Sequence, residues 1–446
     1  MEKKPGFWGL GAAGSSVRQE VVGGLTTFAA MAYIVAVNPL ILGDPNGAGM
    51  PVASVAVATA LAAAVGCFLM AFLTNYPIAL APGMGTNAYF SFLICGVLGV
   101  PWQAALALTF WNGLIFLLLA VSGARKQIAE SLPHGIQIGI QCGIGFFIAF
   151  IGLKNAGLVV ESPATFVQFG SLLEAGPLLA LLGLILMTVL TVRKIPGALL
   201  LGILAITVVG IVVPSGGGGS LTKAPESVWA GSVPLGEIFF SLDLLYPFRE
   251  PALALPVLFT LLLLDMFDSI GTIIGVSRPA KLLDERGKLP KISRALSADA
   301  LATVAGSLLG TSTVTSYVES AAGVQAGART GLSTLVVGVL FLLAVLLAPL
   351  VTAVPAVATA PALVMVGLFM AQGFRFLDYE DFPQVGGAIL TAIAIPLFFS
   401  ITEGIGIGMI FYTLVMALLG RAREISVLTY VIAVGFAVFF AVEALL

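Results

Sequence analysis

The chain has 446 residues, of which 59% are hydrophobic and only 9% are charged, and its mean hydropathy is +1.10. A soluble domain carries about 25% charged residues, so this composition excludes a water-soluble protein and predicts a chain embedded in lipid. The net charge of −2 gives no sign of a nucleic-acid partner, and the three cysteines lie in apolar runs where they cannot form a disulfide framework.

Membrane-spanning helices account for most of the chain. A helix needs about 20 mainly apolar residues to cross a bilayer. In chain order, we predict spans at 22–39, 53–74, 102–121, 134–152, 174–192, 196–213, 253–276, 295–310, 331–350, 356–373, 383–399 and 402–419. The segments 87–98 and 318–328 are too short or too polar to span alone, and we count them as the third and tenth of 14 segments. The last apolar stretch, 427–445, is either an extra span or an interfacial helix.

The positions of the basic residues support this count and predict an orientation. With residues 1–20 as a cytoplasmic N-terminus, all but three of the 20 Lys and Arg residues fall on the cytoplasmic side; the exceptions are Lys154, Lys223 and Arg249. Cytoplasmic loops of membrane proteins carry such an excess of positive charge. We therefore expect a multi-pass protein of the cell membrane.

The 14 segments divide into seven and seven around a Gly-, Ser- and Pro-rich outside linker, 214–252. Because each half has an odd number of segments, the second half enters the membrane upside down. This inverted repeat is typical of secondary transporters, in which interrupted segments at corresponding positions of the two halves mark the substrate site. The remaining segment, 421–446, falls outside the repeat.

Two stretches, 77–86 and 311–317, interrupt the helical pattern at corresponding places. Irregular backbone cannot face lipid, because its unpaired N–H and C=O groups cannot bond to water there. We therefore predict that the two stretches pair as short extended pieces, each leading into a half-helix whose N-terminal amides point to one spot. Asn87 and Glu319 stand at the two starts as counterparts. The alternative is that both only satisfy local amide groups.

The eighth segment, "PVLFTLLLLDMFDSIGTIIGV" (256–276), carries Asp265 and Asp268 three residues apart, on one side of the helix. An Asp at a helix centre costs about 2.5–3.5 kcal/mol to insert, and no Lys or Arg lies within the spans to pair with it. A hydrogen-bonded structural role is the alternative, chiefly for Asp268. Without a buried cation, Asp265, Asp268 and Glu319 should bind and release protons near neutral pH, as proton coupling requires.

These carboxyl groups suit a planar heterocycle such as a purine. A carboxylate accepts two neighbouring N–H groups, and a protonated carboxyl donates one hydrogen bond while it still accepts another. Nearby aromatic residues offer stacking surfaces: Phe28, Tyr33, Tyr89, Phe267 and Tyr317. Each alone is more often a packing residue, and Tyr317, Phe267 and Phe28 are the best candidates for ligand contact.

Other kinds of site have no support in the sequence. One histidine and three scattered cysteines cannot form a transition-metal site, no phosphate-binding loop is present, and no Ser/His/acid arrangement suggests a nucleophile. We expect no catalytic residue, no metal, no cofactor and no nucleic-acid partner, and therefore no enzyme. The lack of a continuous polar stripe argues against a channel.

Four motifs resemble the AzgA-like purine permeases of the nucleobase–cation symporter (nucleobase–ascorbate transporter) superfamily. They are "GGLTTFAAMAYIVAVNP" (23–39), "APGMGTNAYF" (81–90), "LLDMFDSIGTIIGV" (263–276) and "GTSTVTSYVESAAGVQAGARTGL" (310–332), and they span nearly the whole chain in order. The resemblance implies an all-α fold of 14 segments in two inverted repeats. It also implies a core domain, 21–126 with 253–350, a gate domain, 127–213 with 351–420, and a homodimer formed through the gate domain.

The resemblance also implies proton-coupled uptake of adenine, guanine and hypoxanthine. The superfamily's substrate carboxylates correspond to Asp265 and Glu319, and its tyrosine two residues before the second of these to Tyr317. In the AzgA-like branch, Asn87 and Asp268 also matter. Many members have Leu at Thr86 and Thr at Ser269, and we expect Thr86, if it faces the cavity, to shift the purine preference.

The leading hypothesis is therefore a proton–purine symporter in a lipid bilayer. The alternative is a carrier of the same fold for another solute, such as xanthine, uracil or an inorganic anion. An anion carrier should place a cation at the half-helix starts, where this chain has acidic residues, so the sequence disfavours that alternative.

Overall fold

The computed structural model describes residues 7–122, 133–214, 219–224, 235–284 and 289–443. Several basic residues that we expect on the cytoplasmic side lie outside these ranges: Lys3, Lys4, Arg125, Lys126, Arg286 and Lys288. Two stretches of the expected outside linker, 215–218 and 225–234, also lie outside them.

Within these ranges, nine helices are long and apolar enough to cross a membrane. They are Val17–Leu42 (α1, Val17–Met31, and α2, Ile34–Leu42), α3 (Val52–Thr74), α5 (Trp102–Ser122), α7 (His134–Asn155), α8 (Ala175–Val192), α11 (Pro251–Ser277), Gly331–Thr352 (α14, Gly331–Ala344, η2, Val345–Leu347, and α15, Ala348–Thr352), Ala356–Phe376 (α16, Ala356–Ala371, and η3, Gln372–Phe376) and α18 (Ile401–Leu418). Further helices are α9 (Ala198–Val212), α10 (Tyr246–Arg249), α12 (Ile292–Leu309), α17 (Phe382–Phe398), η4 (Ala422–Glu424) and α19 (Val427–Glu443). Every predicted full span coincides with one of these helices.

Local sequence explains where several helices begin. The Ser16 hydroxyl accepts a hydrogen bond from the Gln19 N–H at 3.3 Å, and the Thr330 hydroxyl accepts one from the Leu332 N–H at 3.3 Å, so both residues cap the helices that follow them. Pro251 is the first residue of α11. Proline is common at this position because the first N–H groups of a helix have no partner within the helix.

The chain forms two compact units, which are described separately. The first contains Met1–Ser122 and Asn155–Ala362, and the second contains Gly123–Lys154 and Leu363–Leu446.

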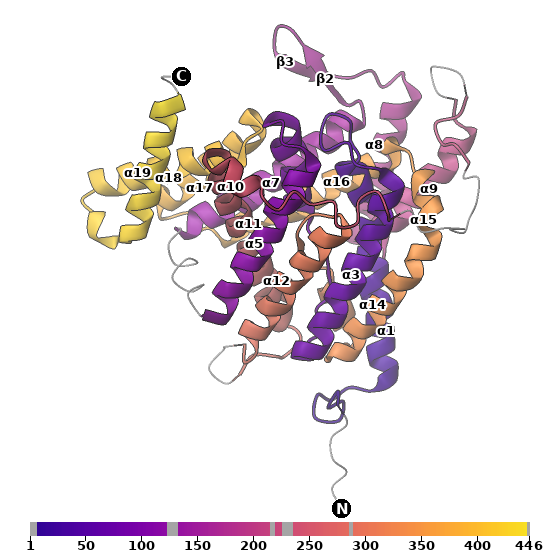
Figure 1. Ribbon diagram of the computed structural model, residues 1–446. Helices are drawn as coiled ribbons and strands as arrows, with labels where there is room; N and C mark the ends of the chain where they lie inside the picture. The colour runs from indigo at the N-terminus through magenta and orange to yellow at the C-terminus, as the bar shows by residue number, and fades with distance from the viewer. Residues whose placement is uncertain (1–6, 123–132, 215–218, 225–234, 285–288, 444–446) are drawn as a thin grey trace, which may run out of the picture. The chain divides into compact units, whose positions relative to one another are not determined.

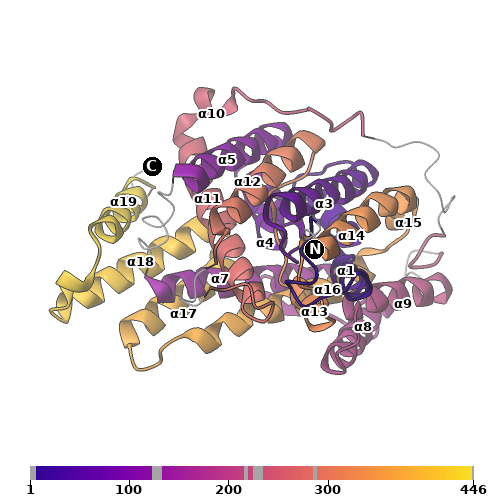
Figure 2. The same ribbon diagram turned by 90° about the horizontal axis from the view of Figure 1, so that it is seen from below.

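A row of packed helices forms the centre of the first unit (Figures 1 and 2). Helix α3 packs between α14 and α12, α12 packs in turn against α5, and α1 packs on the other side of α14. Glycines allow the close approach: a Cβ on Gly113 of α5 would lie 2.9 Å from Val304 of α12, and one on Gly338 of α14 would lie 2.6 Å from Phe68 of α3. Small residues at helix contacts are how membrane helices pack closely.

Two short strands cross within this unit, as the sequence predicts. Strand β1 (Leu80–Pro82) pairs antiparallel with β4 (Val314–Ser316), with Ala81 opposite Thr315 at the centre. Each strand leads into a short helix: β1 into α4 (Met84–Ala88), which continues as the π-helix η1 (Tyr89–Val97), and β4 into α13 (Ser320–Gln325). The predicted pairing of the two extended stretches is confirmed.

A second strand pair corrects the expected all-α fold. Strand β2 (Val159–Ser162) pairs with β3 (Phe166–Phe169) in a hairpin between α7 and α8. All four residues of β3 are exposed. Val159 and Val160 precede a turn that contains Pro163, and Phe166, Val167 and Phe169 follow it; β-branched and aromatic residues of this kind favour strands.

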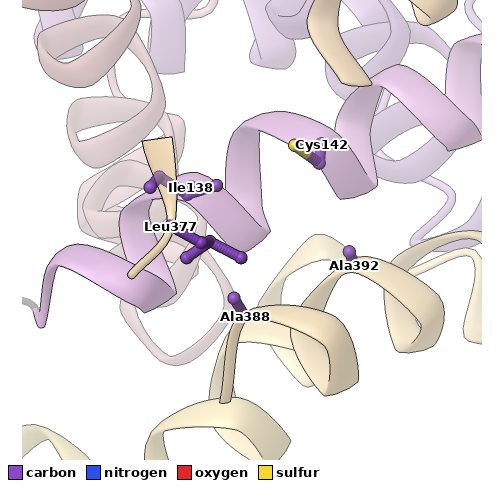
Figure 3. Packing of buried hydrophobic residues seen from close by; sticks show 5 residues of the cluster. All are labelled: Ile138, Cys142, Leu377, Ala388 and Ala392. Carbon is purple, nitrogen blue, oxygen red and sulfur yellow. The ribbon is translucent and has the colours of Figure 1, made fainter. Parts of the chain in front are cut away.

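In the second unit, α17 packs against both α18 and α7. Ile138 and Cys142 of α7 form a buried cluster with Leu377 and with Ala388 and Ala392 of α17 (Figure 3). A Cβ on Gly139 would lie 2.6 Å from the Ala388 carbonyl oxygen, so only glycine allows this approach.

Candidate functional site

The backbone N–H and C=O groups on the outer edges of the β1–β4 pair form hydrogen bonds with side chains of the neighbouring helices. Cys67 of α3 donates to the Leu80 carbonyl (3.3 Å) and accepts from the Leu80 N–H (3.4 Å). Thr303 of α12 does the same for Val314, with both contacts at 3.1 Å. Because no water is available in a bilayer core, these side chains supply the partners that a strand edge lacks.

Pro82 and Ser316, the last residues of the two strands, also form hydrogen bonds. Tyr317 donates its hydroxyl proton to the Pro82 carbonyl at 2.5 Å. Ser316 donates to Asp299 of α12, from its hydroxyl at 3.0 Å and from its backbone N–H. Proline suits position 82 because it has no N–H to leave unpaired.

The contacts on the two strands correspond in pairs. The first residues, Leu80 and Val314, each exchange two hydrogen bonds with a side chain of a neighbouring helix. After β1, the Gly83 N–H donates to the Thr313 carbonyl at 2.9 Å. After β4, the Tyr317 N–H donates to the Ala79 carbonyl at the same distance. Counting from these pairs, the counterpart of Asn87 is Ala321, and that of Glu319 is Gly85. The expectation that Asn87 and Glu319 occupy equivalent places was wrong by two residues.

Glu319 and Asp268 lie together beside the start of α13. The Tyr33 hydroxyl donates to Oε1 of Glu319 at 2.9 Å, and the Thr315 side chain hydrogen-bonds to Asp268. Asp268 is close enough to interact electrostatically with Glu319, Tyr33 and Tyr317. Asp268 therefore lies near Glu319 and two tyrosines, and it also interacts electrostatically with Asp265 and Asp299.

Asp265 has different neighbours. Its side chain is fully buried and accepts a hydrogen bond from Nδ2 of Asn112 in α5 at 2.9 Å. Asp299 of α12 and, more weakly, Asp268 act on it electrostatically, and the Thr303 side chain is a further hydrogen-bond partner. Three residues along a helix correspond to a rotation that leaves side chains about 60° apart, so Asp265 and Asp268 share a side of α11 but contact different elements.

Asn87 and Thr86 lie at the contact between α4 and the chain that precedes β4. The Ser312 hydroxyl donates to Oδ1 of Asn87, and the Thr313 hydroxyl donates to that of Thr86. Both residues are buried, and Nδ2 of Asn87 has no hydrogen-bond partner within the described ranges. This amide group is available to a ligand or a water molecule.

The predicted stacking residues contact other parts of the protein. Phe28 packs edge-to-face on Phe341 of α14, with ring centroids 5.0 Å apart. Phe28 and Phe267 are both half-buried. Tyr317 is buried, and its hydroxyl is committed to the Pro82 carbonyl, so its ring rather than its hydroxyl can serve a ligand.

Asp299 is a buried acid that the sequence analysis missed. It accepts from the Ser269 hydroxyl at 2.5 Å as well as from Ser316. The predicted span 295–310 placed Asp299 at its fifth residue, close to the start, but α12 begins at Ile292. The signal was the same as for Asp265: a carboxylate well inside an apolar segment.

Comparisons with known proteins decide the family. The model of the Permease family (Xan_ur_permease) matches residues 18–407. The chain belongs to this permease family. It is 40% identical to the adenine permease AdeP of Escherichia coli, over 95% of this chain and 92% of that protein. It is also 40% identical to the guanine/hypoxanthine permease PbuG of Bacillus subtilis, over 97% of this chain and 98% of that protein. The resemblance to AzgA-like purine permeases is confirmed.

The permease also shares its fold with a solved transporter. The transmembrane domain of the cyanobacterial bicarbonate transporter BicA superposes with a TM-score of 0.66, covering 87% of this chain and 97% of that one, at 16% identity. With its apolar helices, the permease is a multi-pass membrane protein.

The chemistry available to the permease is that of carboxylates, hydroxyls and one amide, with the carboxylates of Asp268 and Glu319 half-buried. Across the described ranges no group of three or more His, Cys, Asp or Glu residues could hold a metal ion. Nor does any ion pair there join Lys or Arg to Asp268 or Glu319. Such a site can accept hydrogen bonds from a neutral ligand and exchange protons with it.

Proposed function

We propose that the permease imports purine nucleobases (adenine, guanine and hypoxanthine) by proton symport with alternating access. The observation that carries the proposal is the placement of Asp268 and Glu319 together beside Tyr33, without a basic partner among the described residues. Neighbouring carboxyl groups of this kind accept the adjacent N–H groups of a purine edge. The names of AdeP and PbuG support this substrate class.

Each predicted site residue has a role in the proposal. Glu319 and Asp265 hold the base edge, with Asp268 beside Glu319, and the amide of Asn87 donates to a ring nitrogen or carbonyl. Phe28, Phe267 and the Tyr317 ring supply flat apolar surface, and Thr86 tunes the fit at the start of α4 through its bond to Thr313. Asp265, Asp268 and Glu319 are the candidates for proton binding.

The architecture that we propose is that of 14 segments in two inverted repeats of seven. The core domain comprises 21–126 and 253–350, and the gate domain 127–213 and 351–420. The N-terminus is cytoplasmic, the protein resides in the cell membrane, and two copies associate through the gate domain. The paired contacts of β1 and β4 support the repeat.

The second candidate is the same carrier with another solute, namely xanthine, uracil or an anion. The likeness to BicA concerns the fold alone. Glu319 and Asp268 beside the start of α13 oppose an anion there, whereas xanthine and uracil offer N–H groups much as purines do. The choice among heterocycles depends on measurement.

The test is uptake of radiolabelled adenine, guanine, hypoxanthine, xanthine and uracil into vesicles, with and without an inward proton gradient. We expect purine uptake that the gradient stimulates, and Glu319→Gln should abolish it. The control is Glu20→Gln. Glu20 is buried, whereas Glu319 is half-buried, and Glu20 accepts from the backbone N–H groups of Arg329 and Thr330 at 3.0 and 3.2 Å; Gln keeps one acceptor. Purine uptake that ignores the gradient would refute the coupling.

A further inference from the structure

Three consecutive hydroxyl residues, Thr311, Ser312 and Thr313, form a hydroxyl row between the end of α12 and β4. All three are buried, and each hydroxyl forms a hydrogen bond with a residue of another element. Gly310 ends α12 with a left-handed backbone, at a φ of +95°, a conformation that favours glycine. The turn at Gly310 brings the hydroxyl row beside α4.

The two outer members of the hydroxyl row are bonded to neighbouring helices. The Thr311 hydroxyl accepts from Nδ2 of Asn38 in α2 at 3.0 Å. Thr86 of α4 donates its one hydroxyl proton to the Gly83 carbonyl at 3.0 Å, so in its bond with Thr313 it accepts. The central serine is therefore held on both sides, and neither threonine of the second bond has a proton left for a ligand.

The central member, Ser312, sets the orientation of the Asn87 amide. Its hydroxyl donates to Oδ1 of Asn87, and this is the only hydrogen bond of that hydroxyl among the described residues. The oxygen and nitrogen ends of an amide have nearly the same shape, so hydrogen bonds decide which way round it lies. In the reversed orientation the Ser312 proton would lose its acceptor, and an unpaired buried donor is costly. The NH2 group of Asn87 therefore points away from Ser312.

This NH2 group lies unpaired next to the helix that carries two acids of the site. The Asn87 side chain is fully buried, and its Nδ2 has no hydrogen-bond partner within the described ranges. Helix α4 packs against α11, the helix of Asp265 and Asp268. A buried donor without a partner calls for an acceptor that this part of the chain does not supply. The site thus combines carboxyl groups that accept with an amide that donates.

A purine with a carbonyl group at C6 matches this combination. In guanine and hypoxanthine the N1–H group lies next to the C6 carbonyl, so a carboxylate that accepts from N1–H leaves the carbonyl in need of a donor. Adenine has an amino group at C6 and no proton on N1. An amide held with its NH2 group toward C6 would therefore face a second NH2 group in adenine, and neither of the two can accept.

We propose that Ser312 is a positioning residue for base selection: by holding Asn87 as a donor, it makes the site favour guanine and hypoxanthine over adenine. The inference rests on the proposed function. Ser312 acts through Asn87 and does not itself touch the base. Removal of its hydroxyl frees the amide to turn, so that the amide oxygen can accept from the amino group of adenine.

The experiment measures relative affinities in proteoliposomes of the full chain. Unlabelled hypoxanthine and adenine compete against radiolabelled guanine, and the ratio of their inhibition constants does not depend on how much of the protein is active. We expect the unaltered protein to bind hypoxanthine about tenfold more tightly than adenine, or better, because two opposed donors lose a hydrogen bond. Ser312→Ala should reduce this preference about tenfold, and Ser312→Thr, which keeps the hydroxyl, should retain it.

Two further variants separate positioning from support of the fold. Asn87→Asp keeps the acceptor for Ser312 but replaces the NH2 group with a second oxygen, so the preference should shift toward adenine. The matched control is Ser333→Ala: Ser333 is a buried serine of α14 whose hydroxyl donates to the Thr330 carbonyl at 2.8 Å, and its loss should leave the ratio unchanged. A serine that only supports the fold would weaken the binding of all three bases alike.

The outcomes separate the inference from the function on which it rests. If the unaltered protein binds none of the three bases, the proposed function fails. If it binds them but holds adenine as tightly as hypoxanthine, or if Ser312→Ala leaves the ratio unchanged, the inference is overturned. An equal loss of preference in Ser312→Ala and Ser312→Thr also overturns it, because the hydroxyl is then not the cause. Should Ser312→Ala fail to fold, Asn87→Asp decides, and an unchanged preference overturns the inference.

Discussion

The hydrogen bond from Tyr33 to Glu319 links the first helical segment to the start of α13. Tyr33 lies in the turn between α1 and α2, and its ring is buried, so removal of its hydroxyl alone changes little in packing. We predict that Tyr33→Phe weakens purine binding about tenfold, because hydrogen bonds to charged groups contribute about 1.5–3 kcal/mol. Competition of unlabelled base against labelled base in proteoliposomes measures this affinity.

The control for Tyr33→Phe is Tyr430→Phe. The Tyr430 hydroxyl donates to the Ala422 carbonyl at 3.1 Å in the second unit, so its loss should leave purine affinity unchanged. An affinity for Tyr33→Phe equal to that of the unaltered protein would show that Glu319 does not hold the base through this arrangement.

The sequence alone identified some of the buried polar residues and missed others. Asp265, Asp268 and Glu319 were singled out because a charge inside an apolar span demands a reason. Asp299 escaped because its helix starts earlier than its hydrophobic run, so the acid looked terminal. Asn112 escaped because an uncharged amide in a span costs far less than a carboxylate and gives only a weak signal.

Among the elements, the β1–β4 pair depends on side chains from α3 and α12. We predict that Thr303→Val lowers the free energy of unfolding by about 2 kcal/mol, because the N–H and C=O of Val314 both lose a partner in a region without water. Equilibrium unfolding in detergent or lipid measures the change.

Thr109→Val is the matched control for Thr303→Val. The Thr109 hydroxyl is equally buried, but it donates only to the Ala105 carbonyl of its own helix at 3.0 Å, and that carbonyl keeps its helical partner. Equal destabilisation by the two substitutions would argue that the edge contact of Thr303 carries no special weight.

A partly exposed ion network joins the turn η4, which precedes α19, to the residue before α17. Arg421 bonds to Asp381 at 2.9 Å and to both oxygens of Glu424 at 2.8–3.1 Å. The Arg421 guanidinium holds the pKa of Glu424 below its usual range. A lowered pKa in the folded state means that this contribution to stability is complete above the unfolded pKa, about 4.3, and disappears as pH falls through the lowered value.

We therefore predict that Glu424→Gln lowers the thermal midpoint near pH 7 and has no effect near pH 3, where the unaltered protein has also lost the contact. Glu380→Gln, an exposed acid in the loop before α17, should leave the midpoint unchanged at both pH values. A difference for Glu424→Gln that persists in acid would mean that its charge is not the cause.

The elements themselves were mostly predictable, because long apolar runs leave few choices in lipid. The strand pair was predictable for the same reason, since unpaired backbone has no other solution there. The β2–β3 hairpin was missed because it lies between spans, where hydropathy carries no information, and because the strand preference of the Val and Phe residues around Pro163 was not weighed. The offset between Asn87 and Glu319 required the strand register, which only the three-dimensional contacts provide.

At the scale of the whole molecule, the orientation can be tested with two single cysteines. Lys223→Cys lies in the expected outside linker, and Arg278→Cys follows α11 on the expected cytoplasmic side. In intact cells an impermeant maleimide should label the first, and it should label the second only after permeabilisation. The native Cys67 and Cys142 are buried and Cys95 is half-buried, so the unaltered protein gives the background, and the reverse pattern would invert the topology.

The pairing of Leu80–Pro82 with Val314–Ser316 also constrains how the protein is made. The two strands are more than 200 residues apart in the chain, and at about 5–20 residues per second the ribosome needs ten seconds or more to synthesise the part between them. Throughout that time the first strand has inserted with its backbone unpaired on one side. The nascent first half is therefore incomplete in the bilayer, and it should require a chaperone or the translocon itself until its partner strand emerges.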